Sequence, residues 1–197
     1  MGVIEHYDKL IDENNDPVYD PKTLKEYMDK WDGQTFIDSM RIDETKTVLE
    51  IGVGTGRLAV KTVPLCKKFF GIDISPKTIG RAIGNLSQYQ NAELICDDFM
   101  IYKFHCTFDV VYSSLTFMHI REKQECINKV YSLLNPNGRF VLSIDKSQNE
   151  YIEYGNRKID IYPDNPTDTK GYIINSGLTI LDFIEIEFAY IFVGLKA

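Results

Sequence analysis

The sequence lacks the cysteine spacing that metal and redox motifs require. Its four cysteines, Cys66, Cys96, Cys106 and Cys126, lie far apart, and no C-x-x-C pair occurs. Zinc ribbons and dithiol redox sites need such closely spaced sulfur ligands. We therefore expect no metal centre, and we expect the four thiols to be reduced and mostly buried.

The sequence also lacks a long uncharged apolar run and an excess of basic residues. The most apolar stretch, 178–195, is interrupted by Asp182, Glu185 and Glu187, which is too much charge for a membrane span. The start, MGVIEHYDKL, has no basic region followed by an apolar one, as an export signal would have. Because 29 acidic residues outnumber 22 basic ones, the surface repels polyphosphate chains. We expect a cytoplasmic protein that binds neither membrane nor nucleic acid.

What the sequence does contain is the composition of one globular core. Its 197 residues are 44% hydrophobic and 26% charged, as in ordinary folded domains. Short β-branched runs alternate with amphipathic stretches from Thr47 onward, which favours an α/β fold with a doubly wound, mostly parallel seven-stranded sheet and an antiparallel last strand. The predicted strands are 47–51, 69–73, 92–96, 108–113 and 139–144, followed by two long strands within 178–195 that are joined near Phe188.

Helices are predicted between these strands and before them. Ser75-Pro76 supplies a cap and a first-turn proline for a helix that runs toward Leu86, and Pro64 is expected to end a helix over 57–63. Apolar spacing indicates further helices over 122–134, from Asp20-Pro21 to Trp31, and over 34–40. We divide the chain into an N-terminal helical segment or lid, 1–46, and a core, 47–197, with a small hairpin insertion near 150–162 around Gly155-Asn156.

The strongest functional signal is VLEIGVGTGRLAV, residues 48–60, in which a buried strand turns through three glycines. Gly52, Gly54 and Gly56 leave room for a ligand to approach the backbone, although a tight turn alone could use them. The dinucleotide fingerprint G-x-G-x-x-G would place its third glycine at position 57, which is Arg57, and no Gly-Lys-Ser or Gly-Lys-Thr follows for a phosphate loop.

With Glu50 before G-x-G-x-G, the sequence resembles the class I S-adenosylmethionine (SAM)-dependent methyltransferase family. GIDIS, ICDDF, FDVVYSSLTFMHI and LLNPNGRFVLS match its later motifs in order, so that the resemblance covers residues 47 to about 145. It implies the Rossmann-like methyltransferase fold and SAM as cofactor. In the family, the acid at Asp73 binds both ribose hydroxyls and the acid at Asp97 takes the adenine amino group. The remaining cofactor contacts that the resemblance implies are Glu50, Gly52, Gly54, Gly56, Ile74, Asp98, Phe99, Ser114 and Leu115.

Several assignments stay open at the level of sequence. Glu50 could orient the glycine loop through backbone N–H groups instead of touching the ligand, and Asp73 and Asp97 could be helix-terminal or solvated loop acids. His119 is the candidate general base, because its ordinary pKa lies near neutrality, but we favour the alternative that it is a packed or surface histidine. Tyr7, Tyr19, Tyr27 and Trp31 precede the core, where the family often places a lid. They are the candidate acceptor-binding residues, although core packing explains Tyr27 and Trp31 as well.

The expected function is therefore methyl transfer from SAM to a small-molecule acceptor. Such a reaction needs mainly in-line positioning of donor and acceptor, because the sulfonium already activates the methyl group. The loop after the fourth strand lacks the Asn/Asp-Pro-Pro-aromatic signature that the family uses for amide or base amines. Two alternatives are a SAM-binding sensor or partner subunit without chemistry of its own and, more remotely, an NAD-dependent enzyme.

Overall fold

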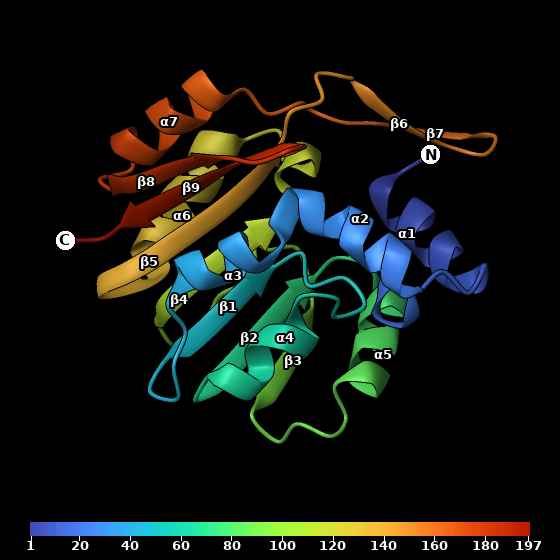
Figure 1. Cartoon of the computed structure of the whole chain (residues 1–197), viewed down its shortest axis with the longest axis horizontal. Coiled ribbons are helices and arrows are strands. Elements are labelled where there is room, and N and C mark those ends of the chain that lie inside the picture. Colours follow the sequence, from blue (N-terminus) through green and yellow to red (C-terminus); the bar gives the residue numbers. More distant parts are fainter.

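The computed structural model describes residues 1–197, in which a seven-stranded sheet carries helices on both faces (Figure 1). The strand order is β3-β2-β1-β4-β5-β9-β8. Neighbouring strands from β3 to β5 are parallel, and β9 runs antiparallel to both β5 and β8. The predicted α/β fold class is thus confirmed. The sheet strands are β1 Thr47–Ile51, β2 Lys68–Asp73, β3 Ala92–Cys96, β4 Phe108–Ser114, β5 Leu134–Asp145, β8 Thr179–Glu185 and β9 Ala189–Leu195.

The two faces of the sheet are covered by two separate hydrophobic cores. Successive residues of a strand point to opposite faces, so Val48 packs in one core and Leu49 in the other. The first core contains buried side chains of α3, α4 and α5, and the second contains those of α6 and α7. This two-sided cover explains why the central strands read as nearly continuous apolar runs.

Two of the helices, α5 and α7, begin at a residue whose side chain caps them. Ser75 accepts a hydrogen bond from the Thr78 N–H at the start of α5, and Asn165 does the same for Thr167 and Asp168 at the start of α7. Proline follows each cap, at the position where a missing N–H has no cost. The helices are α1 Val3–Asp12, α2 Lys22–Asp32, α3 Gln34–Met40, α4 Ala59–Thr62, α5 Pro76–Asn85, α6 Lys123–Leu133 and α7 Pro166–Asn175, with 3-10 turns η1 Pro17–Tyr19, η2 Val63–Leu65 and η3 Phe117–His119.

The structure corrects three local predictions. The helix expected over 57–63 is only the four-residue α4, and Pro64 lies inside the turn η2 instead of ending a helix. The strand expected over 139–144 begins earlier, at Leu134, and Asn137 and Gly138 exchange backbone hydrogen bonds with Lys196 beyond β9. The helix expected from Asp20-Pro21 starts at Lys22, and no side chain caps it.

The first helix and the hairpin inserted between β5 and β8 lie together although they are far apart in sequence. Helix α1 contacts α5 and the hairpin formed by β6 Tyr151–Tyr154 and β7 Arg157–Asp160 (Figure 1). Ser75 donates a 2.7 Å hydrogen bond to Asp8 of α1, and Arg157 of the hairpin forms an ion pair of 2.6 Å with Glu13. The first helix is therefore fixed from both sides.

Two expectations from composition can be compared with the structure. All four cysteines are free, but only Cys66 and Cys126 are buried. The prediction of mostly buried thiols is therefore wrong for Cys96 and Cys106, of which Cys96 lies on the edge strand β3. None of the helices combines the length and apolar character needed to cross a bilayer.

Candidate functional site

A cavity of about 700 Å³ lies where β1, β2 and β4 end and the N-terminal segment covers the sheet. Ligand sites in open α/β sheets occur at the carboxyl ends of the strands, and cavities of roughly 300–1,000 Å³ suit small ligands. Its wall comes from α1, the glycine loop 52–58, the ends of β2 and β3, and the segment from Ser114 to Glu122. Tyr162, which follows the hairpin, also reaches it, whereas no residue of β6 or β7 does.

The three glycines of the loop have different reasons to be glycine. A Cβ at Gly52 would lie 2.0 Å from Oγ1 of Thr116, so this glycine permits close packing against the segment after β4. A Cβ at Gly54 would meet nothing within 4 Å, and Gly54 lines the cavity. Gly56 has a φ of +97° but does not line the cavity. Gly52 and Gly54 thus both line the cavity, but only at Gly54 would a side chain project into open space, and the expectation of ligand space at Gly56 is corrected.

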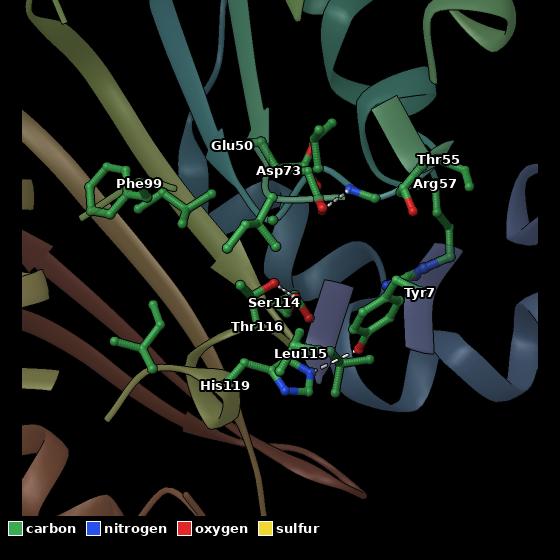
Figure 2. Close-up of a pocket in the computed structure, with 18 of the residues that line it drawn as sticks. Tyr7, Glu50, Thr55, Arg57, Asp73, Phe99, Ser114, Leu115, Thr116 and His119 are labelled. Carbon is green, nitrogen blue, oxygen red and sulfur yellow. Dashed lines mark hydrogen bonds between the residues drawn. The ribbon is translucent and has the colours of Figure 1, made fainter. Parts of the chain in front are cut away.

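Asp73, at the end of β2, holds the glycine loop in place. Its Oδ2 accepts a 3.0 Å hydrogen bond from the Gly54 N–H, and its Oδ1 accepts one of 3.0 Å from the Ser75 N–H. Figure 2 shows this carboxylate on the cavity wall with its bond to the loop dashed. Burial raises the pKa of Asp73, and the backbone N–H groups oppose that rise. A carboxylate has about four acceptor positions, so it can hold the loop and still accept from a ligand.

Glu50 lies deeper than Asp73 and is bonded to a side chain. Its Oε2 accepts a 2.8 Å hydrogen bond from the hydroxyl of Tyr112, which in turn lies 2.8 Å from the hydroxyl of Thr62. Burial raises the pKa of Glu50 to about 8, so the carboxyl is largely protonated at neutral pH. Of the two acids, Asp73 is the one that binds the backbone of the glycine loop.

A buried ion pair joins three parts of the chain beside the cavity. Asp32, at the end of α2, is 0% exposed and accepts hydrogen bonds from both terminal nitrogens of Arg57, the Nη1 bond being 2.7 Å. Ser114 at the end of β4 donates a 2.5 Å hydrogen bond to the same carboxylate. Arg57 and Ser114 both line the cavity. The pair therefore fixes the N-terminal segment, the glycine loop and β4 relative to one another.

A second polar pair forms across the cavity from residues 112 positions apart. The hydroxyl of Tyr7 lies 2.8 Å from Nε2 of His119, as the dashed line in Figure 2 marks. Burial lowers the pKa of His119 to about 4 and raises that of Tyr7, so both groups are neutral at physiological pH. Nδ1 of His119 is buried and has no hydrogen-bond partner. Of the predicted acceptor-binding residues, only Tyr7 meets His119 in this way.

At the β3 end of the cavity lie Asp97, Asp98 and Phe99, as the sequence predicts. Their loop is fixed by its own acids: the Asp97 carboxylate accepts from the Asp98 N–H at 2.7 Å, and the Asp98 carboxylate accepts from the Met100 N–H at 2.8 Å. Ile74 also lines the cavity, as do Ser114 and Leu115 at the end of β4.

Three of the candidate acceptor-binding residues lie outside the cavity, which corrects that prediction. Tyr19 is 73% exposed. Tyr27 packs edge to face against Trp31 and against Phe188, which lies between β8 and β9, and Trp31 packs against Phe188 with tilted rings. From the same helix, Met28 reaches the cavity instead.

Sequence reasoning also missed part of the wall. Val3, Leu10 and Ile11 line the cavity from α1 beside the predicted Tyr7, and the helical spacing of these four residues was the signal that could have revealed this helix. From the sequence, no contact is predicted for Thr55, and Arg57 serves only to exclude the dinucleotide fingerprint. No sequence pattern connects Arg57 with Asp32, because their pairing depends on how α2 packs on the sheet.

Comparisons with known proteins agree with this architecture. A family model described as a methyltransferase domain matches residues 42–165. An uncharacterized methyltransferase of Schizosaccharomyces pombe is 28% identical over 163 residues, which are 75% of this chain and 53% of that protein. A malonyl-[acyl-carrier protein] O-methyltransferase of Ilyobacter polytropus is 31% identical over 101 residues, 49% of this chain and 37% of that protein. The chain thus spans about half the length of the curated relatives it matches.

Solved structures show the same fold at low sequence identity. The crystal structure of a SAM-dependent methyltransferase from Aquifex aeolicus superposes with a TM-score of 0.72 at 14% identity, and the match covers 92% of this chain and 99% of that one. At this identity the likeness concerns the fold.

Proposed function

The chain belongs to the class I SAM-dependent methyltransferase family, and on that premise we propose that it transfers the methyl group of SAM to a small-molecule acceptor. The observation that carries the proposal is the open space at Gly54. The loop is fixed by Asp73, a side chain at Gly54 would project into the cavity, and nothing in the protein fills that volume. Such a cradle suits a ligand that lies against the backbone.

The residues present fit the cofactor along the length of the cavity. Asp73 would accept from the two ribose hydroxyls, and Asp97, Asp98, Phe99 and Ile74 would surround the adenine ring. Gly52, Gly54, Ser114 and Leu115 would hold the methionine part. Bound SAM supplies a methyl group that its sulfonium has already activated, so the protein's task is to orient the partners and exclude water.

The Tyr7–His119 pair would handle the proton of the acceptor. In the tautomer with hydrogen on Nδ1, Nε2 of His119 accepts from the Tyr7 hydroxyl, and the phenol oxygen keeps a lone pair for an acceptor O–H or N–H. As the acceptor atom gains the methyl group it becomes strongly acidic, and its proton can pass to Tyr7 while the Tyr7 proton passes to His119. A base with a pKa near 4 suffices for a proton made so acidic.

The N-terminal segment, 1–46, would act as the lid that excludes water. Helix α1 supplies Val3, Leu10 and Ile11 to the wall, and its bonds to α5 and to the hairpin hold it over the cavity. This segment and the core, 47–197, would form one functional unit, with the acceptor entering near Tyr162 and Arg121.

The test is binding and turnover with the purified chain. Calorimetry should show S-adenosylhomocysteine (SAH) binding at one site, and tritiated SAM should label a component of a metabolite extract only when the chain is present. Binding without labelling of any fraction would favour the alternative of a SAM sensor or partner subunit. Absence of SAH binding at saturating ligand would refute the proposal.

A further inference from the structure

Lys123, the first residue of α6, carries a largely buried ammonium group close to the cavity without lining it. The ammonium donates to the backbone carbonyls of Phe117 and Tyr162, both at 2.9 Å, and to the carboxylate of Asp164 at 2.5 Å. Only 11% of the Lys123 side chain and 2% of the Asp164 side chain are exposed. An ammonium has three N–H donors, so every donor has a partner, and the buried charge is paired.

The bonds of Lys123 join two separate segments of the cavity wall. Phe117 begins the turn η3, which ends at His119, and Tyr162 follows the hairpin. The Tyr162 N–H also donates to the Met118 carbonyl at 2.7 Å. Two successive carbonyls of the turn are thus bound, one by Lys123 and one by Tyr162. This closed network fixes η3, the segment after the hairpin and the start of α6 relative to one another.

The wall residues 119–122 connect η3 with Lys123, and all four line the cavity. The network therefore holds this stretch of wall at both of its ends. Figure 2 shows His119 within it, pointing toward Tyr7, whose hydroxyl lies 2.8 Å from Nε2. Helix α1 holds Tyr7 on the other side through its bonds to α5 and to the hairpin. The bond between the two side chains depends on both supports, because they come from distant parts of the chain.

We propose that Lys123, held by Asp164, is a positioning residue for methyl transfer, which sets His119 and Tyr162 in place at the end of the cavity where the acceptor binds. This assignment rests on the proposed function. A buried ion pair often stabilises a fold no more than apolar side chains of similar volume would. Its distinct contribution here is directional, because one nitrogen fixes three oxygen atoms around it.

The experiment compares two uncharged replacements of the pair that differ in hydrogen bonding. Lys123→Met with Asp164→Asn removes both charges and every donor of the side chain at position 123. Lys123→Gln with Asp164→Asn removes the same charges but keeps an amide that can donate to the backbone carbonyls. Burial lowers the pKa of His119 most, followed by the charges of His6 and Lys123. Loss of the ammonium charge therefore affects that pKa equally in both variants, and any difference between them reports the hydrogen bonds.

Lys196→Met is the matched control. Lys196 also donates to two backbone carbonyls, those of Tyr131 and Leu134, but at the start of β5 and away from the cavity. Thermal unfolding shows whether each variant folds, calorimetry measures SAH binding, and tritiated SAM with the metabolite extract measures turnover. NMR titration of the imidazole signals follows His119 directly, because the chain has only three histidines and His119→Gln assigns the signal.

The methionine variant should bind SAH as the wild type does but label the extract about tenfold less or lower still, since the proton acceptor is misplaced. Its His119 pKa should rise from about 4 toward the ordinary 6.5, because an imidazole that leaves its buried position meets water. The glutamine variant should change much less in both measurements. Lys196→Met should match the wild type in labelling and in the pKa of His119.

The assignment is overturned if the folded methionine variant keeps the wild-type labelling and His119 pKa. Equal changes in the two variants also overturn it, because the charge of Lys123 would then act instead of its bonds. If the methionine variant does not fold, the glutamine variant decides: a His119 pKa near 4 supports the assignment, and one near 6.5 overturns it. A wild type that binds SAH but labels no fraction overturns the proposed function, while the imidazole titration still decides whether Lys123 positions His119.

Discussion

Oδ2 of Asp73 accepts a 3.0 Å hydrogen bond from the backbone N–H of Gly54, so the acid at the end of one strand fixes the glycine loop that follows its neighbour. The same carboxylate is the proposed ribose acceptor. Loop geometry and ligand affinity are therefore coupled through one side chain.

Asp73→Ala should weaken SAH binding and destabilise the fold together. The substitution leaves the N–H groups of Gly54 and Ser75 without their acceptor and removes the ribose acceptor, each loss amounting to about 1–3 kcal/mol. Calorimetry and urea unfolding measure the two effects. Asp109→Ala is the control, because Asp109 accepts from the Thr47 N–H at the opposite end of β1 and should affect stability alone. Unchanged SAH affinity in Asp73→Ala would place the ribose elsewhere.

Gly54→Val should abolish detectable SAH binding while the fold is retained. The valine side chain would occupy the ligand space, and its positive φ of +57° adds strain of about 1–2 kcal/mol. Gly155→Val is a matched control with a φ of +61° and equally open surroundings in the hairpin turn. It should cost similar stability and leave SAH affinity unchanged. Normal affinity in Gly54→Val would contradict the cofactor position.

His119→Gln should make the free energy of unfolding less dependent on pH between about pH 4 and pH 6.5. The folded pKa of about 4 lies below the ordinary value of 6.5, so between these pH values the unfolded chain binds a proton that the folded chain does not. Wild-type stability therefore falls with decreasing pH through this range, by at most about 1.4 kcal/mol per pH unit from this group. Urea unfolding from pH 4 to 7 measures the difference between the two proteins. If the free energy of unfolding depended on pH in the same way in the wild type and in His119→Gln, this prediction would be wrong. The control is His105→Gln, which replaces an exposed histidine.

Glu50→Gln should change how the free energy of unfolding varies as pH rises from 4.5 to 8. The folded pKa of about 8 lies above the ordinary 4.5, so the folded chain retains a proton that the unfolded chain has lost, and wild-type stability declines as pH rises from 4.5 to 8. The glutamine variant does not titrate, so its stability relative to the wild type should increase over that range. Unfolding at pH 6 and pH 9 measures this, with exposed Glu93→Gln as the control. A constant difference would show that Glu50 is ionised throughout.

Asp32→Ala should cost far more stability than a surface ion pair. Loss of the acid leaves the largely buried Arg57 guanidinium without its partner, a change that typically costs about 3–5 kcal/mol. Asp12→Ala, which removes the exposed partner of Lys77, should cost about 1 kcal/mol or less. Thermal unfolding of the two variants compares them. Equal losses would mean that the Asp32–Arg57 pair contributes no more than a surface contact.

The sheet could be predicted because its strands have local signals. Thr47–Ile51 and Phe108–Ser114 are apolar runs of strand length, and Ser75-Pro76 specifies the start of α5 by cap chemistry. The same chemistry at Asn165-Pro166 was overlooked, and with it α7. Helix α7 could therefore have been predicted from its cap residues.

No local sequence pattern predicts the contacts that form across the cavity. Tyr7 meets His119 across 112 residues, and Asp32 meets Arg57 across 25. Each pairing depends on how the first 40 residues fold back over the sheet. The sequence could predict Asp73, Asp97 and Gly54 as cavity residues because they follow strands directly, but Tyr19, Tyr27 and Trp31 could not be placed, since their helix faces were undetermined.

The interlock of α1 with the hairpin has a consequence for the order of folding events. Glu13 and Arg157 form their ion pair at a sequence separation of 144 residues, and contacts of such long separation must first overcome the entropy of closing a large loop. The clasp between the helix and the hairpin therefore depends on elements that other parts of the chain have already brought close together.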